Sequence, residues 1–145
     1  MEIKTFSKQP SLCHCTNIRR ASRAVTQFYD NQLEPSGLKI TQYSLLNHLR
    51  RLGPLTMKEL SQAVRLERTT LIRNLKPLEN MGLVSVEAGK ASTARLVRLT
   101  DRGLNALESA IPYWKQAQQY LNELLSEEES LVWGRVMQKI ESIVP

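Results

Sequence analysis

The chain has 145 residues, of which 41% are hydrophobic and 23% are charged, and its formal net charge is +6. This length is enough for one domain with a real core, and the composition excludes a disordered chain. We therefore expect a single unit, 1–145. No apolar run approaches the roughly 20 residues of a membrane span, and the first residues lack the apolar segment of a secretory signal. We therefore expect a cytoplasmic protein with no membrane partner.

The first two predicted elements are helices. Apolar residues recur every three or four positions over residues 12–33, and the helix that this spacing predicts is ended by Pro35-Ser36-Gly37. A second helix is expected after an N-cap at Thr41, and it closes at Gly53. His48 lies inside this second helix, where we expect a hydrogen-bonded structural histidine.

Two shorter helices joined by a tight turn follow. Thr56 and Glu59 have the spacing of a capping box, in which each side chain accepts a hydrogen bond from the other residue's backbone amide. This pattern predicts a short helix over residues 57–64. The next helix is predicted over residues 68–81, with Gly82 as its left-handed C-cap.

The periodicity then changes from that of a helix to that of a strand. Residues 83–87 and 94–99 are short β-prone runs joined by a polar loop, which predicts a hairpin. Thr100 is expected to cap a long helix kinked at Pro112, and Ser126 begins the last helix with a second capping box. The predicted fold is therefore mainly α with a small β-hairpin wing.

Two short helices followed by a hairpin indicate a winged helix-turn-helix lobe, residues 38–100, whose second short helix enters the major groove of DNA. One side of that helix is apolar: Leu71, Ile72, Leu75 and Leu78. The other side offers groups that bind bases and phosphates and carries no acid. The predicted DNA-binding residues are Thr56, Arg68, Thr69, Thr70, Arg73, Asn74, Lys76, Lys90, Arg95 and Arg98.

The charge distribution supports an anionic partner for this lobe. Residues 1–52 hold eight basic and three acidic side chains, for a net +5, and residues 53–100 hold eight and four, for +4. Residues 101–145 hold four and seven, for −3. A positive field over the first two thirds of the chain favours double-stranded DNA as the partner.

The remaining segments, 10–34 and 101–145, are expected to be the dimerisation helices of a homodimer. They carry more apolar side chains than one small winged-helix core can cover, and exposed patches of that size usually mark interfaces. These side chains include Leu12, Trp114, Leu121, Leu124, Trp133, Ile140 and Ile143.

Several motifs resemble the MarR family of bacterial regulators. They are Leu55–Ser61, Leu66–Glu79, Gly82–Val84, Arg95–Thr100 with the following Gly103, and Pro112–Trp114. The resemblance covers nearly the whole chain. It implies a homodimer that binds a pseudo-palindromic operator and represses nearby genes until a small aromatic or phenolic ligand, or an oxidant, releases it. The Asp-x-Arg that family members often carry at the wing is replaced here by Ala91 and Thr93, so Lys90 is the substitute cation, with a weaker wing contact.

The two cysteines, Cys13 and Cys15, are too close together to staple a fold. The side chains of Cys13-His14-Cys15 would diverge on a helix, so we expect no metal site. The simplest interpretation is that both thiols are buried. Cys15 also resembles the reactive N-terminal thiolate of the hydroperoxide-sensing branch of the family, although the tyrosine that this branch places before the second helix is replaced by Ile40. Control by a ligand and redox sensing through Cys15 both stay open.

The sequence disfavours two other classes of function, an enzyme and a module that binds RNA or protein. An enzyme would need a catalytic constellation, and the sequence has two histidines, no P-loop, no nucleophile elbow and no dinucleotide fingerprint. We therefore expect neither catalysis nor a cofactor. A winged-helix module that binds RNA or another protein, without operator specificity, is the alternative of another class. The basic, threonine-bearing face and the lack of clustered aromatic residues disfavour it.

Overall fold

A computed structural model describes residues 1, 4–88 and 94–145 of the chain. In chain order the elements are α1 (His14–Leu33), a 3₁₀ turn η1 (Glu34–Ser36), α2 (Ile40–Leu52), β1 (Leu55–Thr56), α3 (Met57–Val64), α4 (Arg68–Asn80), β2 (Val84–Ala88), β3 (Arg95–Leu99), α5 (Asp101–Leu124) and α6 (Glu127–Glu141). The predicted class, mainly helical with a small β wing, is confirmed. No helix within the described ranges is long and apolar enough to cross a membrane.

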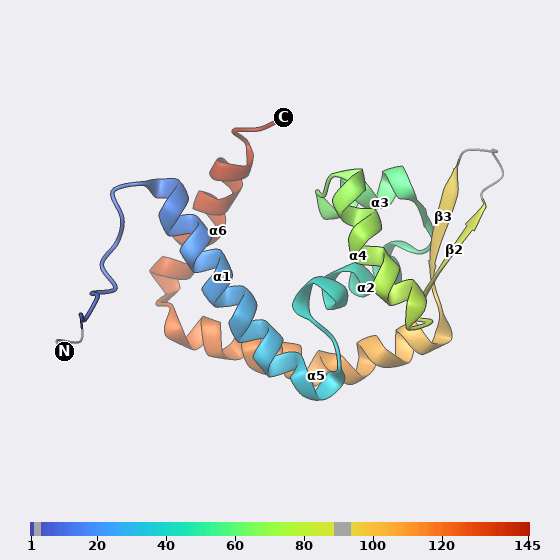
Figure 1. Cartoon of the computed structure of the whole chain (residues 1–145), viewed down its shortest axis with the longest axis horizontal. Coiled ribbons are helices and arrows are strands. Elements are labelled where there is room, and N and C mark those ends of the chain that lie inside the picture. Colours follow the sequence, from blue (N-terminus) through green and yellow to red (C-terminus); the bar gives the residue numbers. More distant parts are fainter. Residues whose placement is uncertain (2–3, 89–93) are drawn as a thin grey trace.

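The long helix α5 joins two parts of the molecule (Figure 1). At its N-terminal end lies a lobe built from α2, α3, α4 and the sheet, and at its C-terminal end lie α1 and α6. The sheet is antiparallel with the order β1-β3-β2, and Leu55 in β1 is opposite Val97 in β3. β1 was not expected, because a strand of two residues has no alternation that a sequence could reveal.

The hydrophobic core lies inside this lobe and consists mostly of leucine side chains, many of them from α2, α3 and α4. Leu33 from α1, and Leu107 and Ala110 from α5, are fully buried in the same core. Trp114 packs at its edge, where its ring stacks on Tyr43 with centroids 5.7 Å apart. Trp114 was expected among the unpartnered apolar side chains, and that expectation is wrong because α2 covers it.

The capping interactions that depend on neighbouring residues are confirmed. In the box at α3 the Glu59 amide donates to Thr56 Oγ1 at 3.2 Å and the Thr56 amide donates to Glu59 Oε2 at 3.0 Å. Ser126 and Glu129 form the same box at α6, with distances of 3.1 and 2.9 Å. Thr100 caps α5 through its side chain. These boxes place the starts of α3 and α6 as predicted.

The starts of the first two helices differ from the prediction. α1 begins at His14, and Leu12 lies outside it, fully exposed at a bend of the chain. Thr41 is not the cap of α2, which begins one residue earlier. The Ile40 amide donates to Asp30 Oδ1 at 2.8 Å, so α1 supplies the side chain that caps α2. A cap that comes from another helix leaves no short-range pattern in the sequence.

His48 has the structural role that was predicted. It is half-buried in α2, and its Nδ1 lies 2.7 Å from the carbonyl oxygen of Ser44, one turn earlier in the helix. Its other neighbours in the sequence, Leu45 and Leu49, are buried in the core.

Candidate nucleic-acid interface

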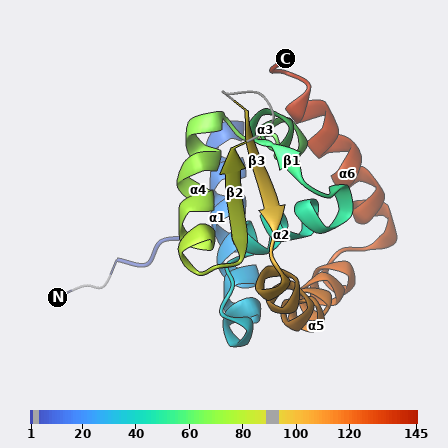
Figure 2. The ribbon, with the colours of Figure 1, turned by 90° about the vertical axis from the view of Figure 1, so that its right-hand side faces the viewer.

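The turn between α3 and α4 sets the direction of α4. Arg65 ends α3 in the left-handed region, with φ 56° and ψ 44°. The Leu66 amide donates to the Ser61 carbonyl at 3.1 Å, and the Ser61 hydroxyl donates back to the Leu66 carbonyl. Because both ends of the turn are tied together, α4 leaves α3 at a fixed angle. α4 then lies beside β2 at the surface of the lobe (Figure 2).

α4 has a buried side and a solvent side. Leu71, Leu75 and Leu78 are 2% exposed or less and anchor the helix in the core. Ile72 was expected among them, but 45% of it is exposed. It lies one residue, or about 100°, from Leu71, which places it at the edge of the solvent side.

The solvent side carries most of the side chains predicted to bind DNA. Arg68, Thr69, Arg73 and Lys76 are exposed there. Thr70 and Asn74 are half-buried at its margins. From Arg68 to Leu78 the helix has no acidic residue, so hydrogen-bond donors and positive charge are presented to solvent without a competing carboxylate. Such a surface suits a polyanion with base edges in a groove.

Thr56 has a structural role as well as the predicted one. Its hydroxyl oxygen is the acceptor that caps α3, which leaves the hydroxyl proton free to be donated. Lys58, two residues on, is exposed in the first turn of α3 and was absent from the predicted set. The capping box could have located it, because the box fixes which residues form that first turn.

The structure does not bring the two wing arginines together. Arg98 is opposite Ser85 and Arg95 is opposite Ala88 in the β2–β3 ladder. Since alternate residues of a strand point to opposite faces, Arg95 and Arg98 lie on different faces of β3. Arg98 is on the face away from the buried Val97. The expectations for Lys90, Ala91 and Thr93 fall on 89–93, outside the described residues.

The thiols of Cys13 and Cys15 at the start of α1 are both exposed, so the prediction that they are buried is wrong. Cys13 is the N-cap residue of α1, and Cys15 lies in its first turn. Hydrogen bonds from the side chain and the backbone of Thr16 lower the pKa of the Cys13 thiol below its ordinary value. Ser11, two residues before Cys13, is held by Asn17: the Ser11 amide donates to Asn17 Oδ1 at 2.7 Å, and Asn17 Nδ2 donates to the Ser11 carbonyl at 2.8 Å. The hydrogen bonds from Thr16 thus favour the thiolate form of Cys13.

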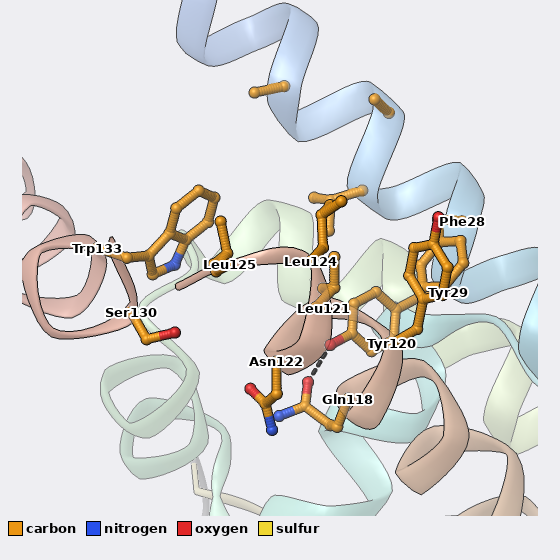
Figure 3. Close-up of a pocket in the computed structure, with 13 residues that line it drawn as sticks. Phe28, Tyr29, Gln118, Tyr120, Leu121, Asn122, Leu124, Leu125, Ser130 and Trp133 are labelled. Atoms are coloured by element: carbon orange, nitrogen blue, oxygen red, sulfur yellow. Dashed lines mark hydrogen bonds between the residues drawn. The ribbon is translucent and has the colours of Figure 1, made fainter. Parts of the chain in front are cut away.

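An apolar groove of about 700 Å³ opens between α1, α5 and α6 (Figure 3). Phe28, Leu121 and Trp133 are among the residues that line it. At one end the Tyr29 hydroxyl donates to Gln118 Oε1, which joins α1 to α5. Burial raises the pKa of Tyr29, so its hydroxyl stays protonated and remains a donor at neutral pH.

Comparison with known proteins places this arrangement among bacterial regulators. Residues 36–93 match a family model described as "MarR family". The chain is 37% identical to M. tuberculosis transcriptional regulator MosR, solved in complex with DNA, with a TM-score of 0.78 over 90% of this chain and 92% of that one. It is also 37% identical over 83 residues to the HTH-type transcriptional regulator YwoH of Bacillus subtilis. That match spans 57% of this chain and 61% of YwoH.

A third likeness concerns the fold alone. Bordetella bronchiseptica BpsR, in a structure that concerns regulation of its DNA binding by 6-hydroxynicotinic acid, is 21% identical. The TM-score is 0.77, over 88% of this chain and 97% of that one. MosR and YwoH are described as transcriptional regulators and not as enzymes. With the helix-turn-helix, the wing and the acid-free run of α4 from Arg68 to Leu78 in place, the chain belongs to the MarR family of DNA-binding transcriptional regulators.

Proposed function

We propose that the chain is a homodimeric repressor that reads a pseudo-palindromic operator with α4. The observation that carries this proposal is the solvent side of α4, where Thr69, Arg73 and Lys76 are exposed on a helix whose other side is anchored by buried leucines. Arg73 can form two hydrogen bonds to guanine, and Asn74 can do the same with adenine. These two residues are assigned to base reading.

The other predicted residues are assigned to the DNA backbone. Thr56, Arg68, Thr69, Thr70 and Lys76 lie at the start of α3 or along α4, where they can donate to phosphate oxygens and fix the register of the helix in the groove. At the wing, Lys90, Arg95 and Arg98 supply positive charge for phosphate or the minor groove. Since Arg95 and Arg98 lie on different faces of β3, Arg98 is assigned to the solvent face of the sheet and Arg95 to the outer end of the strand.

A second copy of the chain is the proposed cover for the apolar surface of α1, α5 and α6. No residue of α6 is buried, and its Leu131, Val132, Trp133 and Val136 are 72, 45, 50 and 39% exposed. The groove beside α6 is apolar along most of its length. A helix with no fully buried side chain in its own chain gains its packing from a partner, and a two-fold related copy also supplies the second reading helix of a palindrome.

Release by a small aromatic ligand is the proposed signal. BpsR shares the fold, and its structure concerns the regulation of its DNA binding by 6-hydroxynicotinic acid, a small aromatic compound. A ligand that binds the DNA-free dimer more tightly than the DNA-bound dimer would shift the equilibrium between these two forms toward the DNA-free dimer. Repression would then end as the ligand accumulates.

Oxidation of a thiol is a second candidate signal, and the exposed N-cap position of Cys13 favours it. Cys13 as thiolate would attack the O–O bond of a hydroperoxide, releasing hydroxide or alkoxide and leaving a sulfenic acid on sulfur. Cys15, two residues away and also exposed, is the thiol available to condense with it, with loss of water. This version moves the first step from Cys15, where the sequence placed it, to Cys13.

Footprinting on the DNA upstream of its own gene tests the proposed function. The expected result is protection of two half-sites about one helical turn, roughly 34 Å, apart. Repeating the footprint with aromatic acids and with hydrogen peroxide separates the two signals. Equal affinity for the upstream DNA and for random duplex, or a preference for RNA, would contradict operator binding. Either result would favour the alternative, a winged-helix module without operator specificity.

A further inference from the structure

The turn that precedes α4 touches the far end of α6. The Arg65 guanidinium is paired with the Glu141 carboxylate, the one ion pair found among residues 1, 4–88 and 94–145. Leu66 of the turn and Gln138 of α6 line the open space of about 810 Å³ around this pair. In Figures 1 and 2 the C-terminal end of α6 and the end of α3 lie on the same side of the molecule, away from α5.

The backbone at Arg65 gives this contact more weight than an ordinary surface ion pair. Arg65 is the one described residue other than glycine that has a positive φ. A side chain is disfavoured in that region, and helix ends of this shape usually use glycine or asparagine. Backbone strain of this kind concentrates at functional positions. What the arginine adds at this position is its long side chain, which reaches Glu141.

α6 has little other attachment within its own chain, because none of its residues is buried. Under the function proposed above, on which this inference rests, α6 packs against the second copy. The Arg65–Glu141 pair therefore joins the helix that holds the dimer to the turn that aims α4. We propose that Arg65 and Glu141 are positioning residues that set the orientation of α4 relative to the dimer axis.

The consequence concerns two reading helices at once. Both must enter successive major grooves about 34 Å apart, so a wider range of α4 orientations lowers the fraction of dimers that fit the operator. Because the side chains of Arg65 and Glu141 are 72 and 56% exposed, salt screens their attraction. The contribution of the pair to operator affinity is therefore largest at low ionic strength.

Charge-neutral variants of α6 test the proposal. Glu141→Gln removes one negative charge at the pair, and Glu128→Gln removes one at the exposed start of the same helix. By net charge alone, both changes should strengthen binding to DNA slightly. The expected result is that Glu141→Gln weakens binding to the footprinted duplex about two- to fivefold, the range of exposed ion pairs, and that Glu128→Gln does not.

A double-mutant cycle with Arg65→Gln shows whether the two residues act together. In the Arg65→Gln background, Glu141→Gln is expected to have no further effect, and exchanging the charges with Arg65→Glu and Glu141→Arg is expected to restore affinity. The proposal is overturned if Glu141→Gln behaves like Glu128→Gln, or if its effect persists without Arg65. If only the Arg65 variants lose affinity for the duplex, the proposal is also overturned, and Arg65 is instead assigned to contact with a DNA phosphate.

Amide hydrogen exchange in the absence of DNA gives an independent readout. Glu141→Gln should speed exchange at residues 65–67, and Glu128→Gln should leave those amides unchanged. Unchanged exchange in Glu141→Gln would refute the positioning role. Wild-type protein that binds DNA without operator preference refutes the proposed function, while the exchange experiment still decides whether the pair holds the turn.

Discussion

Gly103, in the first turn of α5, lies directly against the backbone of Leu83, at the base of the wing. A Cβ built on Gly103 would be 2.0 Å from the Leu83 carbonyl oxygen and 2.7 Å from Cδ1 of Leu99. The same carbonyl accepts a hydrogen bond from the Thr100 amide at 3.1 Å. The residue before β2 and the last residue of β3 therefore meet α5 at a point where only a glycine fits, and this contact fixes the base of the wing relative to the long helix.

Gly103→Ala should lower the free energy of unfolding by about 1–3 kcal/mol, because the added methyl group forces the Leu83 backbone away from α5. Gly134→Ala in α6 is the matched control, since nothing lies within 4 Å of a Cβ there. That change should raise stability by about 1 kcal/mol, the ordinary difference between glycine and alanine in a helix. Urea denaturation at one fixed protein concentration measures both, and similar shifts for the two variants would contradict the close contact.

Arg73→Ala should reduce the preference for operator over random duplex by about 1–3 kcal/mol, the value of a bidentate contact to a base. Lys76→Ala should weaken binding to both duplexes alike and make the salt dependence shallower, because a phosphate contact carries no sequence information. Titrations of both duplexes over a range of salt concentrations measure the two quantities. An unchanged affinity ratio in Arg73→Ala would mean that the reading face lies elsewhere.

Val136→Glu should raise the dissociation constant of the dimer about tenfold or more, because a carboxylate would be buried without a partner in the proposed α6 interface. Gln138→Glu adds the same charge on the opposite side of the helix and should leave the dimer intact. Light scattering at micromolar concentration distinguishes dimer from monomer, and circular dichroism checks that both variants keep their helices. A wild-type protein that is monomeric under these conditions rules out the dimer.

Thr16→Val should slow the alkylation of Cys13 severalfold at neutral pH. The hydroxyl hydrogen bond that lowers the pKa of Cys13 is lost, so the pKa rises and less thiolate is present at pH 7. The rate of the wild type should level off at a lower pH than that of the variant. Thr16→Ser keeps the hydroxyl and serves as the control, with mass spectrometry reporting modification of Cys13 separately from Cys15. Equal rates in all three proteins would show that Thr16 does not activate the thiol.

The elements that depend on local interactions were predictable from residue types and their spacing. Thr56 with Glu59, and Ser126 with Glu129, are three residues apart, so the hydrogen bonds that start α3 and α6 could be read from residue types and spacing. The acid-free run from Arg68 to Leu78 and the change of period after Gly82 were visible for the same reason. These patterns were enough to predict the helices of the lobe, the hairpin of the wing and the position of α4.

Contacts between distant segments were not predictable from the sequence and are known from the fold. Asp30 caps α2, Trp114 lies on Tyr43, and Arg65 meets Glu141 at a separation of 76 residues. Each contact depends on how α5 and the turns orient whole helices, and no short-range preference of the residues encodes that orientation. The left-handed backbone of Arg65 is the clearest case, because in sequence it is an ordinary arginine and its role arises only where α6 ends beside the turn.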